Sequence, residues 1–243
     1  MTPKLYLVGG SVRDKIYNKP VKDYDFAVEA DSYDDMLMYL KSQGAKIWQE
    51  RPEFLSIRCQ FPLVGVDWPP VEGNAAITWV PADFTMCREE EDYFDKRHPL
   101  TVQKTSISVD LSRRDFTINA MAIDAEGVFH DPFNGHADLI AGTIRCVGDP
   151  YSRFNEDPLR IVRALRFAVT LGFTIDGATS KAMRLNMHLV DSLPVERIRD
   201  EFNKMFKVNW RNSMEMLLNY SSLCTLLQSK YPNLWFEPTT KER

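Results

Sequence analysis

Two aspartates at alternate positions of an apolar segment indicate the first possible chemistry. The segment "DYDFAV" begins at Asp23, and Asp25 follows two residues later. If residues 23–28 form a strand, both carboxylates project from one face and Tyr24 from the other. Two adjacent negative charges are costly unless a cation neutralises them, and hard oxygen ligands suit Mg²⁺. The pattern predicts a metal site at Asp23 and Asp25. The alternative is that one aspartate caps a turn while the other is solvated.

The turn that precedes these aspartates has the composition of a phosphate site. Gly9 and Gly10 expose backbone N–H groups, Ser11 is expected to cap a helix over residues 11–18, and Arg13 adds a cation. Backbone amides, a helix dipole and an arginine together favour a triphosphate. Neither the Walker A pattern nor the dinucleotide-binding glycine pattern is present. With the carboxylates, the turn predicts nucleotidyl transfer, in which two Mg²⁺ ions activate a 3′-hydroxyl and bridge the triphosphate.

The elements that would position these residues form a mixed α/β pattern. A helix is expected from Ser32, its cap, to Gly44, its end. Residues 62–79 are rich in Pro and Gly and indicate a long loop or hairpin, and residues 88–99 a charged, mobile loop. Strands are expected at residues 4–8, 23–28, 53–61 and 83–88, and as a pair at 115–124 and 127–133.

After Phe133 the pattern becomes helical. Apolar periodicity predicts four helices, at residues 157–172, 176–193, 195–207 and 211–230. The expected fold class is therefore α/β followed by all-α, with a mixed sheet flanked by helices in the first part.

Composition indicates an ordinary globular protein of 243 residues with four scattered cysteines, which are typical of reduced thiols and a cytoplasmic location. We expect no signal peptide and no bilayer-spanning run. Residues 1–137 carry 15 Lys and Arg against 22 Asp and Glu, a balance of −7. Because the whole chain has a formal charge of −4, residues 138–243 carry +3, which makes the helical part the weakly favoured nucleic-acid face.

Four motifs together resemble the class II CCA-adding enzymes (tRNA nucleotidyltransferases) and bacterial poly(A) polymerases, over roughly residues 5–205. The motifs are "GGSVRD…KDYDFAV", "RRDFTINAMAID", "DPFNG" and "EDPLRIVRALRFA". The resemblance implies a nucleotidyltransferase head at residues 1–137, an all-helical neck that recognises the base at 138–208, and a truncated helical body at 209–243.

The resemblance also implies roles for individual residues. Asp23 and Asp25 fall on the metal-binding carboxylates. Asp83 could be a third catalytic carboxylate or an ordinary residue at a strand edge. The Gly9–Ser11 turn and Arg13 fall on the phosphate contacts, and "DPFNG" falls on a hinge between head and neck. Arg114 and Asp115 fall on a motif that contacts ribose and phosphates, although an internal ion pair would also explain them. Arg88 and Arg97 fall in the family's mobile loop.

Base selection is implied for Asp157 and Arg160, with Arg163 and Arg166 nearby. On one helix, residues 157 and 160 would face the same way. A carboxylate accepts a hydrogen bond from the amino group of cytosine or adenine, and an arginine donates to the adjacent ring nitrogen. Uracil and guanine present a carbonyl where the carboxylate needs a donor, which costs about 1–3 kcal/mol. The alternative is a surface salt bridge between the two residues. Arg163 and Arg166 are expected to meet phosphates or to hold Asp157 in place.

The sequence therefore predicts a Mg²⁺-dependent enzyme that adds C, C and A to the 3′ end of tRNA from CTP and ATP. The expected partners are the 3′ end and acceptor stem of tRNA, because the C-terminal region is shorter than is usual in the family. Two alternatives stay open: a polymerase that adds only A, and an idle RNA-binding relic. The oligomeric state, monomer or dimer, is left open as well.

Overall fold

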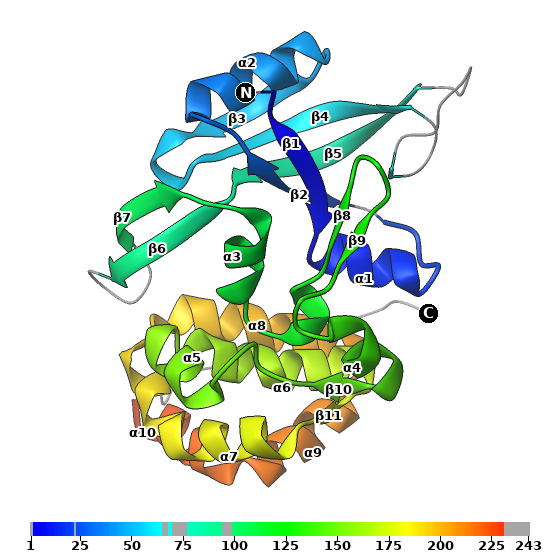
Figure 1. Ribbon diagram of the computed structural model, residues 1–243. Helices are drawn as coiled ribbons and strands as arrows, with labels where there is room; N and C mark the ends of the chain where they lie inside the picture. The colour runs from blue at the N-terminus through cyan, green and yellow to red at the C-terminus, as the bar shows by residue number, and fades with distance from the viewer. Residues whose placement is uncertain (1, 22, 65–67, 70–76, 94–98, 231–243) are drawn as a thin grey trace. The chain divides into compact units, whose positions relative to one another are not determined.

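The computed structural model describes residues 2–21, 23–64, 68–69, 77–93 and 99–230 (Figure 1). The chain consists of two compact units, Met1–His136 and Ala137–Arg243. No helix in these described ranges is both long enough and apolar enough to cross a bilayer.

The first unit is built on a seven-stranded mixed sheet with the strand order β3-β4-β5-β2-β1-β8-β9. Only the β2–β5 pair is parallel, and the other neighbours are antiparallel. The strands are β1 (Lys4–Val8), β2 (Tyr24–Glu29), β3 (Lys46–Arg51), β4 (Ser56–Val64), β5 (Ile77–Met86), β8 (Ala122–Asp124) and β9 (Phe129–His130).

Alternation along β2 and β5 separates an aromatic core from a polar face. Phe26 and Phe84 are register partners, and their rings stack with centroids 4.8 Å apart. Phe61 on β4 packs against Phe84 at 5.0 Å. Asp25 and Asp83 are also register partners, one position earlier on each strand. Because neighbouring residues of a strand point to opposite faces, the register that stacks the phenylalanines also sets the two aspartates side by side on the other face.

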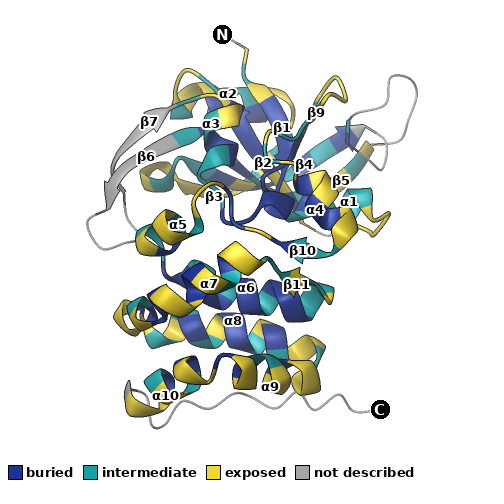
Figure 2. Cartoon of the chain, turned by 60° about the horizontal axis from the view of Figure 1, so that its bottom comes forward, coloured by how far each residue is buried: buried dark blue, intermediate teal, exposed yellow. Residues whose placement is uncertain are grey.

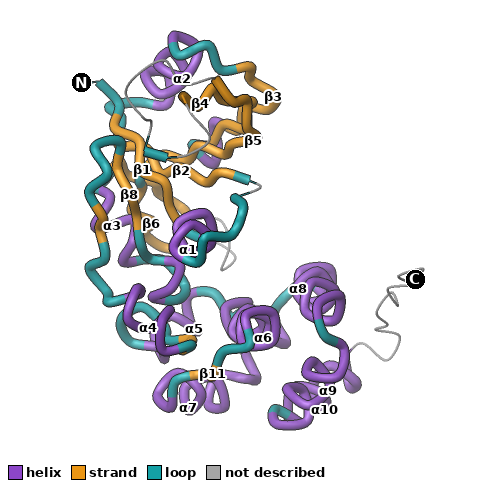
Figure 3. The backbone as a smooth tube through the Cα atoms, turned by 90° about the vertical axis from the view of Figure 1, so that its right-hand side faces the viewer, coloured by secondary structure: helices purple, strands orange, loops and turns teal. Residues whose placement is uncertain are grey.

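Short helices complete the first unit. Helix α2 (Tyr33–Ser42) packs beside β4 and buries Met36 and Leu40 (Figures 1 and 3). Its predicted cap is confirmed, because the Ser32 side chain accepts a hydrogen bond from the Asp35 N–H. The other segments are α1 (Gly10–Ile16), α3 (Ile107–Ser112), α4 (Gly135–Ala141, which crosses into the second unit), and the 3₁₀ turns η1 (Pro52–Phe54) and η2 (Thr117–Asn119).

The second unit is helical around a central helix, α6 (Leu159–Leu171), which has eight buried residues and packs along α8 (Val195–Val208) (Figure 2). Gly172 ends α6 in the left-handed conformation, at φ +72°. The remaining elements are α5 (Pro150–Glu156), α7 (Gly177–Asn186), η3 (Met187–Ser192), α9 (Trp210–Asn219), α10 (Ser221–Lys230), and a small parallel pair, β10 (Thr143–Ile144) and β11 (Thr174–Ile175).

Several expected elements differ from the observed ones. The single helix predicted at 211–230 is two helices, because the chain breaks at Tyr220 between α9 and α10. Of the strand predicted at 115–124, only β8 is extended, and Thr117–Asn119 forms η2 instead. The segment at 88–99, which was expected to be a charged loop, contributes instead to an antiparallel ribbon of β6 (Arg88–Tyr93) and β7 (Pro99–Lys104). Arg97 lies outside the described residues. β3 and the short helices α3, α4 and α5 were not predicted.

Candidate active site

Three residues on neighbouring strands form a charged row on the polar face of the sheet. Arg58 on β4 is the register partner of Asp83, and Asp83 is the register partner of Asp25. The Arg58 guanidinium lies 3.3 Å from a carboxylate oxygen of Asp83 and 3.6 Å from one of Asp23. The structure thus brings together the three carboxylates that the sequence singled out and adds a cation that sequence reasoning missed.

The proximity of these carboxylates changes their acidity. The pKa of Asp25 is raised to about 6, first by partial loss of solvation and then by the charges of Asp83 and Asp23, which outweigh the opposing effects of Arg114 and Arg58. Desolvation also raises the pKa of Asp83, against the opposing effect of Arg58. Like charges held this close favour a bound cation, which is the electrostatic condition expected of a metal-dependent site.

Ser11 ties the glycine turn to the start of the carboxylate strand. Its hydroxyl donates to the carbonyl of Asp23 at 3.0 Å and accepts from the N–H of Asp25 at 3.1 Å. The prediction that Ser11 caps the helix is wrong, because α1 begins at Gly10 and its cap is Gly9. The Ser11 side chain is buried and engaged, so its contribution is to hold β2 in position next to the turn.

The glycines of the turn lie against two arginines. Gly9 adopts φ +66°, and a Cβ there would lie 3.3 Å from Nη1 of Arg114. A Cβ on Gly10 would lie 3.3 Å from Nη2 of Arg13. Glycine at position 9 is therefore required by its backbone conformation. Because neither glycine has a side chain, the two guanidinium groups can lie close to the main chain of the turn.

Asn119 connects the residues of the "RRDFTIN" motif to Arg13. Its side-chain oxygen accepts from Nη1 of Arg13 at 2.9 Å, and its amide donates to Asp115 at 3.0 Å. Asp115 is buried and also accepts from the backbone N–H of Phe116 at 2.8 Å. Asp115 therefore positions other groups, whereas Arg13 and Arg114 carry the positive charge.

Asp110 is the second residue that sequence reasoning missed in this region. It is almost fully buried, and its carboxylate oxygens lie 2.6 Å from Nη2 of Arg113 and 2.9 Å from Nη2 of Arg114. Burial alone would raise the pKa of Asp110, but the two guanidinium groups outweigh it and lower the pKa below the ordinary value. Arg114 thus forms an internal ion pair, as the alternative interpretation expected, with Asp110 as its partner, and it also acts electrostatically on Asp25.

The "DPFNG" motif forms a capped, tightly packed turn. Asp131 accepts hydrogen bonds from the N–H groups of Gly135 at 2.6 Å and His136 at 3.0 Å, at the start of α4. A Cβ on Gly135 would lie only 2.1 Å from the carbonyl oxygen of Thr117. The glycine is needed there because the turn packs directly on the backbone of η2.

The residues implied in base selection have partners other than those predicted. Asp157 does not lie on the helix with Arg160. It precedes α6 because Pro158 follows it and restricts its backbone to the extended region. The Asp157 carboxylate accepts a hydrogen bond from the N–H of Leu159 at 3.0 Å. Its carboxylate lies 3.6 Å from Arg197 of α8, while Arg160 contacts Glu156 at 2.9 Å. Base reading by this pair stays a prediction.

Arg163 and Arg166 lie farther along α6. Arg166 forms a close ion pair with Glu201 of α8 and stacks over Phe167, with its guanidinium carbon 3.8 Å from the ring centroid. Burial would raise the pKa of Glu201, but Arg166, Arg163 and Lys204 together lower it. Arg166 therefore braces two helices through Glu201. Contact of Arg163 and Arg166 with phosphates or with Asp157 stays a prediction.

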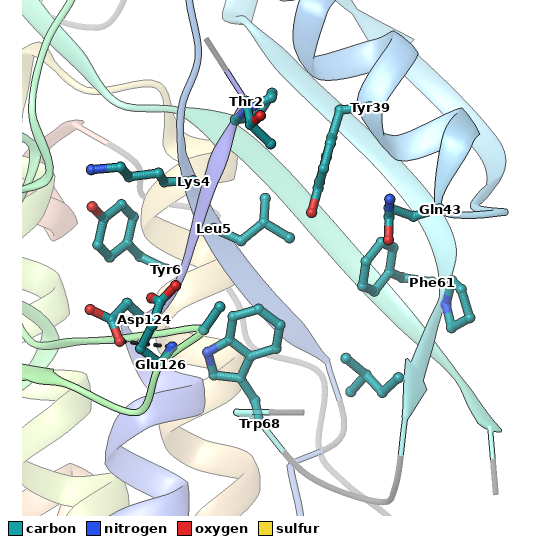
Figure 4. Close-up of a pocket in the computed structure, with 14 residues that line it drawn as sticks. Thr2, Lys4, Leu5, Tyr6, Tyr39, Gln43, Phe61, Trp68, Asp124 and Glu126 are labelled. Atoms are coloured by element: carbon teal, nitrogen blue, oxygen red, sulfur yellow. Dashed lines mark hydrogen bonds between the residues drawn. The ribbon is translucent and has the colours of Figure 1, made fainter. Parts of the chain in front are cut away.

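A separate cavity of about 750 Å³ lies in the first unit (Figure 4). Tyr39, Phe61 and Trp68 form much of its wall, and Lys4 and Glu126 lie at its polar side. None of the predicted site residues lines it, so the carboxylate row and the arginines belong to a different surface.

Comparison with known proteins agrees with this arrangement. A family model described as "Poly A polymerase head domain" matches residues 5–145, and a second, "Probable RNA and SrmB- binding site of polymerase A", matches residues 172–237. A CCA-adding enzyme of Streptococcus suis (strain 05ZYH33) is 37% identical over 216 residues, which are 88% of this chain and 48% of the relative. The chain thus spans about half the length of the curated relatives it matches.

Solved structures show the same fold. A tRNA nucleotidyltransferase complexed with a primer tRNA and an incoming ATP analog matches with a TM-score of 0.71 at 29% identity, covering 97% of this chain and 61% of that one. The apo form II of a CCA-adding enzyme matches with a TM-score of 0.76 at 26% identity, covering 97% and 52%. By its matched motifs, its sheet and its carboxylate row, the chain belongs to the poly A polymerase head-domain family.

Proposed function

We propose that this chain adds C, C and A to the 3′ end of tRNA, with CTP and ATP as nucleotide substrates. The observation that carries the proposal is the in-register row of Asp25, Asp83 and Arg58 beside the Gly9–Gly10 turn. Curated relatives from Streptococcus suis and Geobacillus, both named CCA-adding enzyme, support tRNA over other acceptors. They also favour CCA addition over addition of A alone.

The carboxylate row fits a divalent cation, and we assign Mg²⁺ to Asp23 and Asp25. Within the described part of the chain, no group of three or more His, Cys, Asp and Glu side chains is arranged as a complete metal cage. Mg²⁺ in nucleotide sites typically uses one or two carboxylates, with substrate phosphates and water as its other ligands. When bound, the metal supplies positive charge at the reacting phosphate and lowers the pKa of the 3′-hydroxyl.

The arginines beside the turn are the groups that would hold the triphosphate. Arg13 and Arg114 are fixed by Asn119 and Asp110, so little side-chain entropy remains to be lost when a phosphate binds. Gly9 and Gly10 keep the main chain of the turn free of side chains next to these cations. Asp115 acts through Asn119 and does not itself face the phosphates in this assignment.

Base selection is assigned to Asp157 and Arg160 in the helical unit. The Asp157 carboxylate is positioned by its hydrogen bond to the start of α6 and by Arg197, and it keeps acceptor capacity for an exocyclic amino group. Arg160 is held by Glu156 and by the carbonyl of Arg153. A carboxylate acceptor beside an arginine donor matches cytosine and adenine and mismatches uracil and guanine.

The deciding experiment offers the purified chain a tRNA that lacks CCA, with labelled CTP or labelled ATP and Mg²⁺. Full CCA addition predicts that CMP is incorporated first and that AMP follows only when CTP is also present. Incorporation of AMP alone, without CTP, would instead identify an A-adding enzyme. The Asp25→Asn variant serves as the inactive control.

A further inference from the structure

An exposed aromatic strip lies on the same sheet face as the carboxylates. Residues 77, 79, 81 and 83 of β5 alternate to one face, so Ile77 and Trp79 share the face of Asp83. Ile77 is 60% exposed and Trp79 is 41% exposed. On β3, Lys46 is the register partner of Gln60 and therefore shares this face, while Trp48 lies at an irregularity in the register between Ile47 and Gln49. We call Lys46, Ile77 and Trp79 the aromatic strip.

The register shows that the strip continues the candidate active site. Across β4 and β5 the pairs on this face are Arg58 with Asp83, Gln60 with Pro81, and Pro62 with Trp79. Four residues along a strand span about 13 Å, which places Trp79 roughly four stacked nucleotides away from Asp83. A single strand whose end reaches the carboxylates is therefore long enough to reach the strip.

The charges on this face match a polyanion. The ammonium group of Lys46 lies 4.5 Å from the centre of the Trp79 ring, which holds a cation beside an exposed aromatic surface. Through the β3–β4 register, Arg51 lies on the same sheet face as Gln49 and Arg58. Glu50 pairs with Ile57 and lies on the opposite face. Cations interleaved with exposed aromatic rings are the features by which proteins bind single-stranded nucleic acid without reading its sequence.

We propose that the aromatic strip is a stacking platform for the single-stranded 3′ end of the RNA substrate. Trp79 stacks on a base, and Lys46 neutralises a phosphate. The identity of the RNA as tRNA rests on the proposed function, but the platform itself requires only a single strand. Ile77 and Trp79 stand at the end of segment 62–79, which the sequence analysis singled out, and the nucleotide site uses neither of them.

Binding of RNA to the full chain, measured without nucleotide and without metal, tests the platform apart from catalysis. The probe is a short, labelled single-stranded RNA ending in C-C, followed by fluorescence anisotropy. Because stacking on one ring contributes about 1–3 kcal/mol per base, Trp79→Ala should raise Kd about tenfold, while Trp79→Phe should retain most of the affinity. Lys46→Gln should reduce the slope of log Kd against log salt by about 0.7.

Phe129→Ala is the control, because Phe129 is 42% exposed on β9, at the opposite edge of the sheet from β3 and outside the residues matched by the RNA-binding family model. Its Kd should equal that of the unmodified chain. Unchanged RNA binding by Trp79→Ala would overturn the platform, as would an equal loss in Phe129→Ala. Self-association in sedimentation that Trp79→Ala abolishes, with RNA binding intact, would assign the face to a second copy and also overturn the platform.

The two proposals fail separately. If the chain incorporates neither CMP nor AMP but Trp79→Ala still weakens RNA binding, the platform is supported and the proposed function is lost. If the chain extends tRNA normally and Trp79→Ala changes neither Kd nor the KM for the tRNA, the platform is overturned and the proposed function stands.

Discussion

Replacing Asp25 by asparagine should stabilise the first unit at neutral pH, although it removes a proposed metal ligand. The variant keeps the shape of the side chain and deletes the charge that Asp83 and Asp23 oppose. In the folded chain the pKa of Asp25 is raised from 3.8 to about 6. The folded state therefore binds this proton more tightly than the unfolded state does, and the charged carboxylate opposes folding.

The size of the effect follows from the pKa shift. A difference of about 2 pKa units corresponds to about 3 kcal/mol if it is fully expressed. The Asp25 side chain is exposed, so solvent screening reduces the expected gain to about 1 kcal/mol. The sign depends on pH: the penalty is absent below about pH 4, where both states are protonated, grows between pH 4 and 6, and is complete above pH 6.

The assay is urea unfolding of the unmodified chain and Asp25→Asn in metal-free buffer at pH 4, 5.5 and 7.5. Hydrogen exchange of peptides that cover β2 and β5 reports the first unit by itself. Glu126→Gln, at an exposed turn, is the charge-removal control and should show no pH-dependent gain. A variant that gains nothing at pH 7.5, or gains equally at pH 4, would refute the proposed repulsion among the carboxylates.

Three further outcomes are expected. Gly135→Ala should destabilise the chain by about 1–3 kcal/mol, because its Cβ would meet the Thr117 carbonyl, whereas Gly177→Ala, which has open space, should be nearly neutral in thermal unfolding. Glu201→Gln should lower the free energy of unfolding by about 3 kcal/mol, because it leaves Arg166 buried without its carboxylate. An Arg166→Met, Glu201→Leu double variant should recover this stability. A loss that the double variant does not recover would contradict this reasoning. Asp157→Ala should relax discrimination against UTP and GTP more than it slows CTP incorporation, and unchanged discrimination in competition assays would remove its base-reading role.

Local patterns determined much of the candidate site. Asp23 and Asp25 were recognisable because a period of two in an apolar segment requires both carboxylates on one strand face. The capped helix at Ser32 and the glycine end of α6 follow from backbone preferences that act within a few residues. The charged and glycine-rich motifs were likewise readable, since their chemistry depends on residue type and near spacing.

Only the tertiary structure decided which residues meet across the chain. Arg58 and Asn119 carry no local signal, because their roles arise from strand register and from packing between distant segments. Asp110 differs, since it pairs with Arg113 and Arg114 three and four residues later, a local spacing that sequence reasoning overlooked. The shared helix face expected of Asp157 and Arg160 did not form, because Pro158 keeps Asp157 off the helix, and the Asp157 carboxylate instead meets Arg197 of α8, forty residues later. Sequence spacing determines which side chains share a face, but ion pairs form wherever folding brings opposite charges together, and that depends on the whole chain.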